Sequence, residues 1–127
     1  MLSELTAHEA LDGLVAGDLT SVELTRSVLD RIDATEPQIN AYISVDADGA
    51  LDAAARVDRQ RQAGEDPGPL AGIPLAIKDV LCVRGGRTTC GSGILADYVA
   101  PYDATAVARV RDAGAVFLGK TNMDEFA

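Results

Sequence analysis

The sequence predicts a single α/β domain in which helices precede a small buried sheet. Apolar residues recur at helical spacing through much of the first 64 positions, residues 73–80 are apolar on both faces, and a helical pattern separates them from a second apolar run at 115–118. A strand, a helix and a second strand in that order imply a right-handed βαβ unit with parallel strands. With 127 residues, of which 47% are hydrophobic, the chain can bury one core of domain size.

Two helices are expected before residue 40. Apolar residues at helical spacing from Ala7 stop at Gly17, which predicts a short amphipathic helix. The sequence TSVE at 20–23 has the form of a capping box, in which Thr20 and Glu23 each accept from the backbone N–H of the other. A second helix is therefore expected from this point up to Pro37, which we expect to end it because proline lacks the backbone donor.

The middle of the chain alternates strand and helix patterns. NAYISV at 40–45 fits a strand, and residues 47–64 return to a helical pattern that ends at a glycine. EDPGPLAG at 65–72 is a turn-rich linker. The run at 73–80 is typical of a strand that is covered on both faces of a sheet.

The second half contains a long loop and the remainder of the βαβ unit. Residues 82–93 are rich in glycine and hydroxyl side chains, which predicts a loop over a functional or packed surface. Asp103 is expected to cap a helix that carries Val107 and Val110 and ends at Gly114. The following AVFL is then a short buried strand.

The charge distribution argues against several classes of partner. The net charge is −9, and all of the excess lies before residue 71, with fourteen acidic and five basic residues there and six of each afterwards. Nucleic acids and anionic membranes are bound through Lys and Arg, so this balance disfavours both, and direct phosphate binding with them. No run approaches the ~20 apolar residues of a membrane span, and the acidic N-terminal segment does not resemble a signal peptide, so we expect a cytoplasmic protein.

The cysteine and histidine content excludes two kinds of site. Cys82 and Cys90 are too few for a disulfide framework, and His8 is the one histidine, so no Cys/His metal cluster is expected. We interpret both cysteines as free thiols and His8 as a surface residue.

One motif matches a nucleotide-binding pattern but lies in the wrong context. GAVFLGKT at 114–121 fits the phosphate-loop pattern G-x-x-x-x-G-K-[ST]. That mechanism needs a strand before the first glycine and a flexible loop after it, whereas here a helix precedes and a buried strand follows. We therefore interpret the segment as a helix end and a strand end, and not as a nucleotide site at Lys120.

Lys78 is the candidate catalytic residue, because AGIPLAIKDV at 71–80 places one ammonium group in an apolar run. Alternation puts Lys78 on one face with Ala76 and Val80, and Asp79 on the other, so Lys78 and Asp79 cannot pair by adjacency. Burial disfavours the charged form of an amine, so a buried lysine could act as a base near neutral pH, which arginine cannot do. A strand-end lysine whose ammonium reaches water along its stem is the alternative reading.

A lysine base suits a Ser-Lys hydrolase. Thr88, Thr89 and Ser92 follow Lys78 within the predicted loop, but CGSG at 90–93 lacks the full nucleophile-elbow pattern. We interpret Ser92 as a turn residue.

The residues resemble those of a known family. GPLAGIPLAIKDVLCVRGGRTTCGSGIL at 68–95 and YDATAVARVRDAGAVFLGKTNMDEFA at 102–127 look like the N-terminal part of the amidase signature enzymes. PYDAT and GKTNMDEFA are similar in particular to the glutamine-hydrolysing subunits of tRNA-dependent amidotransferases, and LTSVELTRSVLDRI and INAYISV also fit those subunits.

The resemblance implies a fold and an activity. The implied fold is a three-layer α/β/α sandwich with a mixed central sheet, of which residues 1–127 are the N-terminal portion: a mainly helical segment at 1–64 and the start of the sheet core at 71–127. The implied activity is glutamine hydrolysis to ammonia by a Ser-cisSer-Lys triad, whose lysine matches Lys78. Both serines and the oxyanion-hole amides of the family lie downstream of Ala127, so the isolated chain is expected to be inactive.

The resemblance also implies partners. These are the B and C subunits of an amidotransferase heterotrimer, glutamine as substrate, and mischarged tRNA reached mainly through the B subunit, which uses ATP and Mg. No cofactor or metal is expected on this chain itself. Two alternatives stay open: part of a stand-alone amidase acting on another small amide, and a non-catalytic interaction or folding module.

Overall fold

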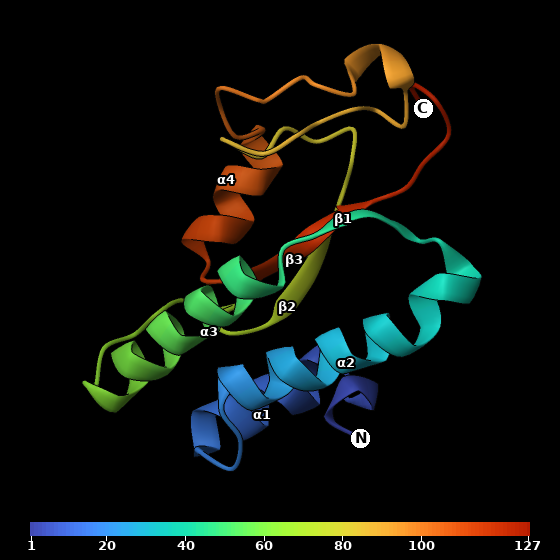
Figure 1. Cartoon of the computed structure of the whole chain (residues 1–127). Coiled ribbons are helices and arrows are strands. Elements are labelled where there is room, and N and C mark those ends of the chain that lie inside the picture. Colours follow the sequence, from blue (N-terminus) through green and yellow to red (C-terminus); the bar gives the residue numbers. More distant parts are fainter.

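The computed structural model describes all of residues 1–127 and combines helices with a three-stranded sheet (Figure 1). In chain order the elements are η1 (Leu2–Glu4), α1 (Ala7–Ala16), α2 (Ser21–Ile39), β1 (Tyr42–Val45), α3 (Ala47–Gln62), β2 (Pro74–Lys78), η2 (Gly93–Leu95), α4 (Thr105–Asp112) and β3 (Val116–Thr121). None of the helices combines the length and the apolar character that crossing a membrane requires.

The sheet is mixed, with β3 between β1 and β2. β2 is parallel to β3, as the strand, helix, strand order predicts, and β1 is antiparallel to it. β1 pairs only with residues 119–121 of β3. The helices α1 and α2 lie on one side of the sheet and α4 on the other, with α3 alongside β3 (Figure 1). The predicted α/β class with a mixed sheet is confirmed.

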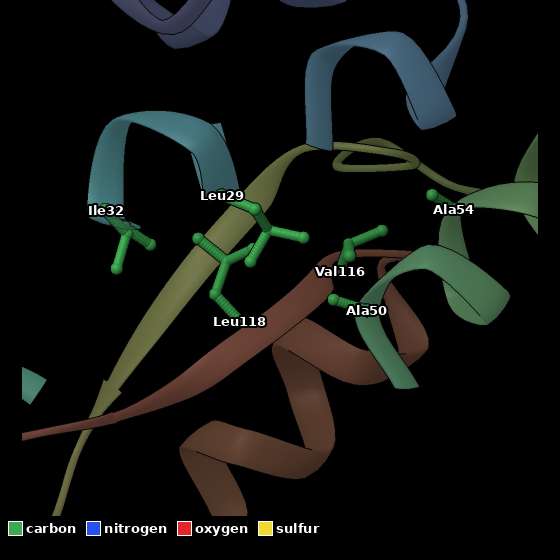
Figure 2. Close-up of a cluster of buried hydrophobic side chains, with 6 residues drawn as sticks. All are labelled: Leu29, Ile32, Ala50, Ala54, Val116 and Leu118. Atoms are coloured by element: carbon green, nitrogen blue, oxygen red, sulfur yellow. The ribbon is translucent and has the colours of Figure 1, made fainter. Parts of the chain in front are cut away.

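Two apolar clusters hold the helices to the strands. The larger one joins α2, α3 and β3 through Leu29, Ile32, Ala50, Ala54, Val116 and Leu118 (Figure 2). Ala50 and Ala54 of α3 are fully buried, and their small side chains let the helix approach β3 closely. A second cluster joins α1 and α2 to Ile73 at the start of β2. Each buried leucine, isoleucine or valine contributes about 1.5–3 kcal/mol of burial free energy, so these contacts orient the strands.

The predicted starts and ends of the first two helices are largely confirmed. Thr20 Oγ1 accepts from the backbone N–H of Glu23 at 3.1 Å, and the Glu23 carboxylate accepts from the backbone N–H of Thr20 at 2.8 Å, which is the expected capping box. Helix α1 ends at Gly17, whose φ of 80° a glycine adopts without steric cost.

The prediction that Pro37 ends the second helix is wrong. Helix α2 continues through Pro37 to Ile39 and ends at Asn40, which has a left-handed φ of 53°. Pro37 stands in the last turn, where its missing N–H removes only one helical hydrogen bond. The Glu36 carboxylate then accepts from the backbone N–H of Tyr42 at 2.7 Å and ties the helix end to β1.

The prediction that Asp103 caps α4 is also wrong. The N-cap residue is Ala104, which offers no side-chain hydrogen bond. The Asp103 carboxylate instead accepts from the backbone N–H of Arg84 at 2.7 Å and from the Arg111 guanidinium at 2.9 and 3.1 Å. Two competing donors, both distant in sequence, therefore hold this side chain away from the helix terminus.

Strand β2 is covered on one face and not on both, which corrects a third expectation. Ile77 is buried, whereas Ala76, Lys78 and Val80 are exposed. The period-two alternation is as predicted, but no element of this chain packs over the second face.

Candidate active site

The carboxyl ends of the parallel strands β2 and β3 place two lysines and an aspartate side by side. Ile77 pairs with Lys120 and Lys78 with Thr121 along this ladder. In α/β folds, ligands characteristically bind at the carboxyl ends of the strands. We therefore take this end of the sheet as the candidate site.

Lys78 is exposed and uncommitted at this end of the sheet. Its side chain lies on the open face of β2, opposite Asp79, as alternation predicts. The ion pairs of the chain all involve other residues. The structure thus places the candidate base at a strand end but does not enclose it, because nothing covers its neighbours Ala76 and Val80. Its catalytic role stays a prediction.

Asp79 and Lys120 form a buried ion pair beneath this open face. Their side chains are 1% and 8% exposed, and Lys120 Nζ lies 2.9 Å from Asp79 Oδ1. The same nitrogen donates to the Arg87 carbonyl and to Thr88 Oγ1, at 3.2 Å in each case. Two of the three ammonium hydrogens are used in these hydrogen bonds, and the contact with Asp79 Oδ1 is an ion pair.

The second oxygen of Asp79 fixes the loop that follows β2. Asp79 Oδ2 accepts from the backbone N–H of Thr89 at 2.9 Å and from the Thr89 hydroxyl. Burial on its own raises the pKa of the Asp79 carboxyl, but the hydrogen bonds from Thr89 and Lys120 outweigh it and hold the pKa below its ordinary value. The carboxylate therefore stays charged and binds the loop to the end of β2.

The loop hydroxyls have structural partners. Ser92 is buried, donates to Glu125 Oε1 at 2.6 Å and accepts from the backbone N–H of Ile94 at 3.3 Å. This bond caps η2 and agrees with the interpretation of Ser92 as a turn residue. Thr88 and Thr89 bind Lys120 and Asp79, so none of the three hydroxyls is directed at Lys78 as a nucleophile.

The glycines of GAVFLGKT serve backbone packing. A Cβ on Gly119 would lie 2.1 Å from the Ser44 carbonyl oxygen, and one on Gly114 would lie 2.4 Å from the Pro67 carbonyl oxygen. Residues 116–121 form β3, not a phosphate-binding loop. This context agrees with the interpretation of the motif as a helix end and a strand end.

Sequence reasoning missed the role of Lys120 as the partner of Asp79. The available signal was the position of Asp79 on the same face as Ile73 and Ile77, since a carboxylate on a buried face needs a cation. Cys82 and Cys90 are free thiols and His8 is exposed, as predicted.

The family model described as Amidase matches residues 23–127, and the chain belongs to this family. It is 57% identical over 122 residues to the A subunit of the glutamyl-tRNA(Gln) amidotransferase of Acidothermus cellulolyticus, covering 96% of this chain and 24% of that protein. It is 56% identical over 129 residues to the corresponding protein of Salinispora tropica, covering 99% and 26%. The chain spans about a quarter of the length of these relatives.

Solved structures share the fold. The peptide amidase of Stenotrophomonas maltophilia superposes with a TM-score of 0.90 at 42% identity, covering 98% of this chain and 26% of that one. A fatty acid amide hydrolase gives a TM-score of 0.88 at 25% identity, covering 94% and 21%. The chain therefore has the architecture of part of an amidase domain.

Proposed function

We propose that this chain supplies the lysine-bearing part of a glutamine amidohydrolase that provides ammonia for tRNA-dependent amidation, with Lys78 as its base. One structural observation carries the choice of residue. Of the two lysines, Lys120 forms a buried ion pair, whereas Lys78 is exposed at the carboxyl end of a strand and forms no ion pair. The similarity to two A subunits of glutamyl-tRNA(Gln) amidotransferases, at 57% and 56% identity, supports the choice of reaction.

The proposed reaction is acyl transfer from nitrogen to oxygen. Neutral Lys78 takes a proton, through a bridging serine, from a nucleophilic serine that attacks the glutamine carboxamide carbon. The C–N bond breaks and the nitrogen leaves as ammonia after receiving that proton, and water then hydrolyses the glutamyl ester. Both serines come from polypeptide outside this chain. Burial favours a neutral amine, so Lys78 acts as the base once further polypeptide covers the open face of β2.

The ammonia is consumed elsewhere in the proposed assembly. B and C subunits are the partners, and the B subunit uses ATP and Mg to activate the mischarged tRNA. The isolated 127-residue chain, lacking the serines, releases no ammonia from glutamine.

A chimera tests this proposal. This chain replaces the matching quarter of the Acidothermus cellulolyticus protein, and ammonia release from glutamine is measured with the partner subunits present. Lys78→Ala is expected to lower kcat by about 10³-fold or more. Lys78→Arg should be equally inactive because a guanidinium does not give up its proton. Arg109→Ala removes an exposed cation from α4 as a matched control and should leave kcat unchanged.

Two results would contradict the proposal. One is a Lys78→Ala chimera that keeps most of its activity. The other is ammonia release by the isolated chain that Lys78→Ala abolishes, since that requires a nucleophile within residues 1–127.

A stand-alone amidase is the second candidate, favoured by the TM-score of 0.90 and 42% identity with the peptide amidase. Assaying peptide amides beside glutamine, with and without partner subunits, separates the two. Activity on peptide amides that needs no partner would favour the second candidate.

A further inference from the structure

A cleft lined by three arginines lies away from the candidate active site. It has a volume of about 460 Å³ and is bounded by α3, the turn at 83–86, the end of α4 and the start of β3. Arg56, Arg84 and Arg111 line it from three separate segments, together with Gln60, Asp46 and Phe117. Lys78 is not part of its wall.

The charge of this cleft is opposite to that of the whole chain. Its wall holds three cations and one carboxylate, whereas the chain has 20 acidic and 11 basic residues. That carboxylate, Asp46, accepts from the backbone N–H of Gly49 at 3.0 Å and so caps α3. Asp46 forms no ion pair with these arginines, and Arg111 is paired with Asp103, so the unpaired positive charge of the wall is that of Arg56 and Arg84.

The three guanidinium groups differ in how they are held. Arg111 is fixed, because it binds both oxygens of Asp103 at 2.9 and 3.1 Å and lies 4.7 Å from the centre of the Phe117 ring. Arg56 and Arg84 take part in none of the ion pairs of the chain, and Arg84 is anchored by its backbone N–H, which donates to Asp103 at 2.7 Å. The cleft thus has one guanidinium group that is held in place and two that form no ion pair.

We propose that this cleft binds a phosphate group, with Arg56 and Arg84 donating to its oxygens beside the fixed guanidinium of Arg111. Guanidinium groups match phosphate oxygens in pairs of parallel hydrogen bonds. A phosphate dianion has enough acceptors and charge to engage donors from three directions, which a single carboxylate lacks. The net charge of the chain disfavours phosphate contacts over its surface as a whole, and this cleft is a local exception.

The phosphate belongs either to a small phosphorylated compound or to the backbone of an RNA. The cleft volume lies within the range of small-ligand pockets, about 300–1,000 Å³, so it has room for more than the phosphate itself. The site is independent of the proposed glutamine chemistry, since it contains none of the residues assigned to that reaction.

The test is a nuclear magnetic resonance titration of the 127-residue chain with inorganic phosphate at low ionic strength. Saturable shifts are expected at the amides of Arg84, Gly85 and Gly86, which border the cleft. Arg56→Gln and Arg84→Gln should each weaken binding by about tenfold or more, as the loss of a charge-assisted hydrogen bond predicts. Arg59→Gln removes the same charge from the same helix at a position outside the cleft wall, and binding should stay within about twofold of the unchanged chain. Circular dichroism checks that every variant is folded.

A second titration uses a short oligoribonucleotide. If it binds more tightly than inorganic phosphate and both arginine variants abolish that binding, the RNA backbone is the source of the phosphate. If inorganic phosphate binds and the RNA does not, the ligand is a small phosphorylated compound. The proposal is overturned if neither probe gives saturable shifts at the cleft, or if Arg59→Gln weakens binding as much as the two cleft variants do.

Discussion

Lys78 and Asp79 are adjacent and oppositely charged, yet they point to opposite sides of β2. Asp79 enters the interior, where Lys120 and Thr89 bind both of its oxygens. Lys78 points away from this cluster and keeps its amine free. A slip of one residue along the strand would exchange the two side chains, so the buried pair also fixes which of them is exposed.

Removing one member of the buried pair should destabilise the chain. Lys120→Met leaves the Asp79 carboxylate without its cation in a site where the side chain is only 1% exposed. Breaking a buried pair in this way costs about 3–5 kcal/mol. Urea denaturation followed by circular dichroism measures the loss.

The double variant Asp79→Asn/Lys120→Met is the control for this prediction. It removes both charges and leaves none unpaired, so it should recover most of the stability lost by Lys120→Met. Equal losses in the single and double variants would mean that packing, and not the unpaired charge, accounts for the effect.

For single residues, the sequence predicted the face to which a side chain points better than the residue with which it pairs. Alternation along β2 correctly separates Lys78 from Asp79, and the capping box at Thr20 follows from spacing alone. The Asp79 and Lys120 pair joins two strands that lie far apart in the sequence, and no local spacing indicates it. The enclosure of Lys78 stays a prediction, because no element of this chain covers its face of the strand.

Among the elements, the pairing of β1 with β3 requires a glycine at one position of β3. A Cβ on Gly119 would lie 2.1 Å from the Ser44 carbonyl oxygen and 2.9 Å from the Val45 Cα, both backbone atoms of β1. Gly119→Ala should therefore separate β1 from β3 and lower the free energy of unfolding by about 2 kcal/mol or more. Gly93→Ala, where a Cβ would have nothing within 4 Å, should change it by less than about 0.5 kcal/mol. If both variants unfold at the same urea concentration, the close approach of the two strands is not what requires the glycine.

The elements also show where local patterns fail. Helix, strand and linker positions follow from periodicity and from glycines. The end of α2 does not, because a proline in the last turn removes only one hydrogen bond and Asn40 provides the actual terminus. Asp103 stands one residue before the N-cap Ala104 of α4, and its oxygens bind Arg84 and Arg111. The first error is local, since it concerns where in the last turn the helix ends, whereas the second arises from a contact between Asp103 and Arg84, 19 residues earlier in the chain.

For the molecule as a whole, acid should unfold the chain through a small set of carboxylates. The hydrogen bonds described above hold the pKa of Asp79 below its ordinary 3.8, and the Arg111 guanidinium and the Arg84 backbone N–H do the same for Asp103. The backbone N–H and hydroxyl groups of Thr6 and Thr20 lower the pKa of Glu9 and Glu23 below 4.5. A lowered folded-state pKa means that the unfolded chain binds more protons, so stability is complete above these ordinary values and is lost as pH falls through the lower, folded-state ones.

The urea midpoint should therefore be constant from pH 7 to about pH 5 and fall towards pH 3. Asp79 should dominate because its carboxylate is buried, whereas solvent screens the exposed capping glutamates. In Asp79→Asn the urea midpoint should decrease less between about pH 5 and pH 3 than in the unchanged chain. An identical pH dependence in the two would assign the effect to other groups.

The strand order also has a consequence for synthesis. Of these three strands β3 is translated last, and it lies between β1 and β2, which do not pair with each other. As the polypeptide leaves the ribosome, β1 and β2 cannot form their hydrogen bonds to β3 until residues 116–121 have emerged. The helices can form turn by turn from local contacts, but the sheet assembles only in a late step that joins segments far apart in sequence.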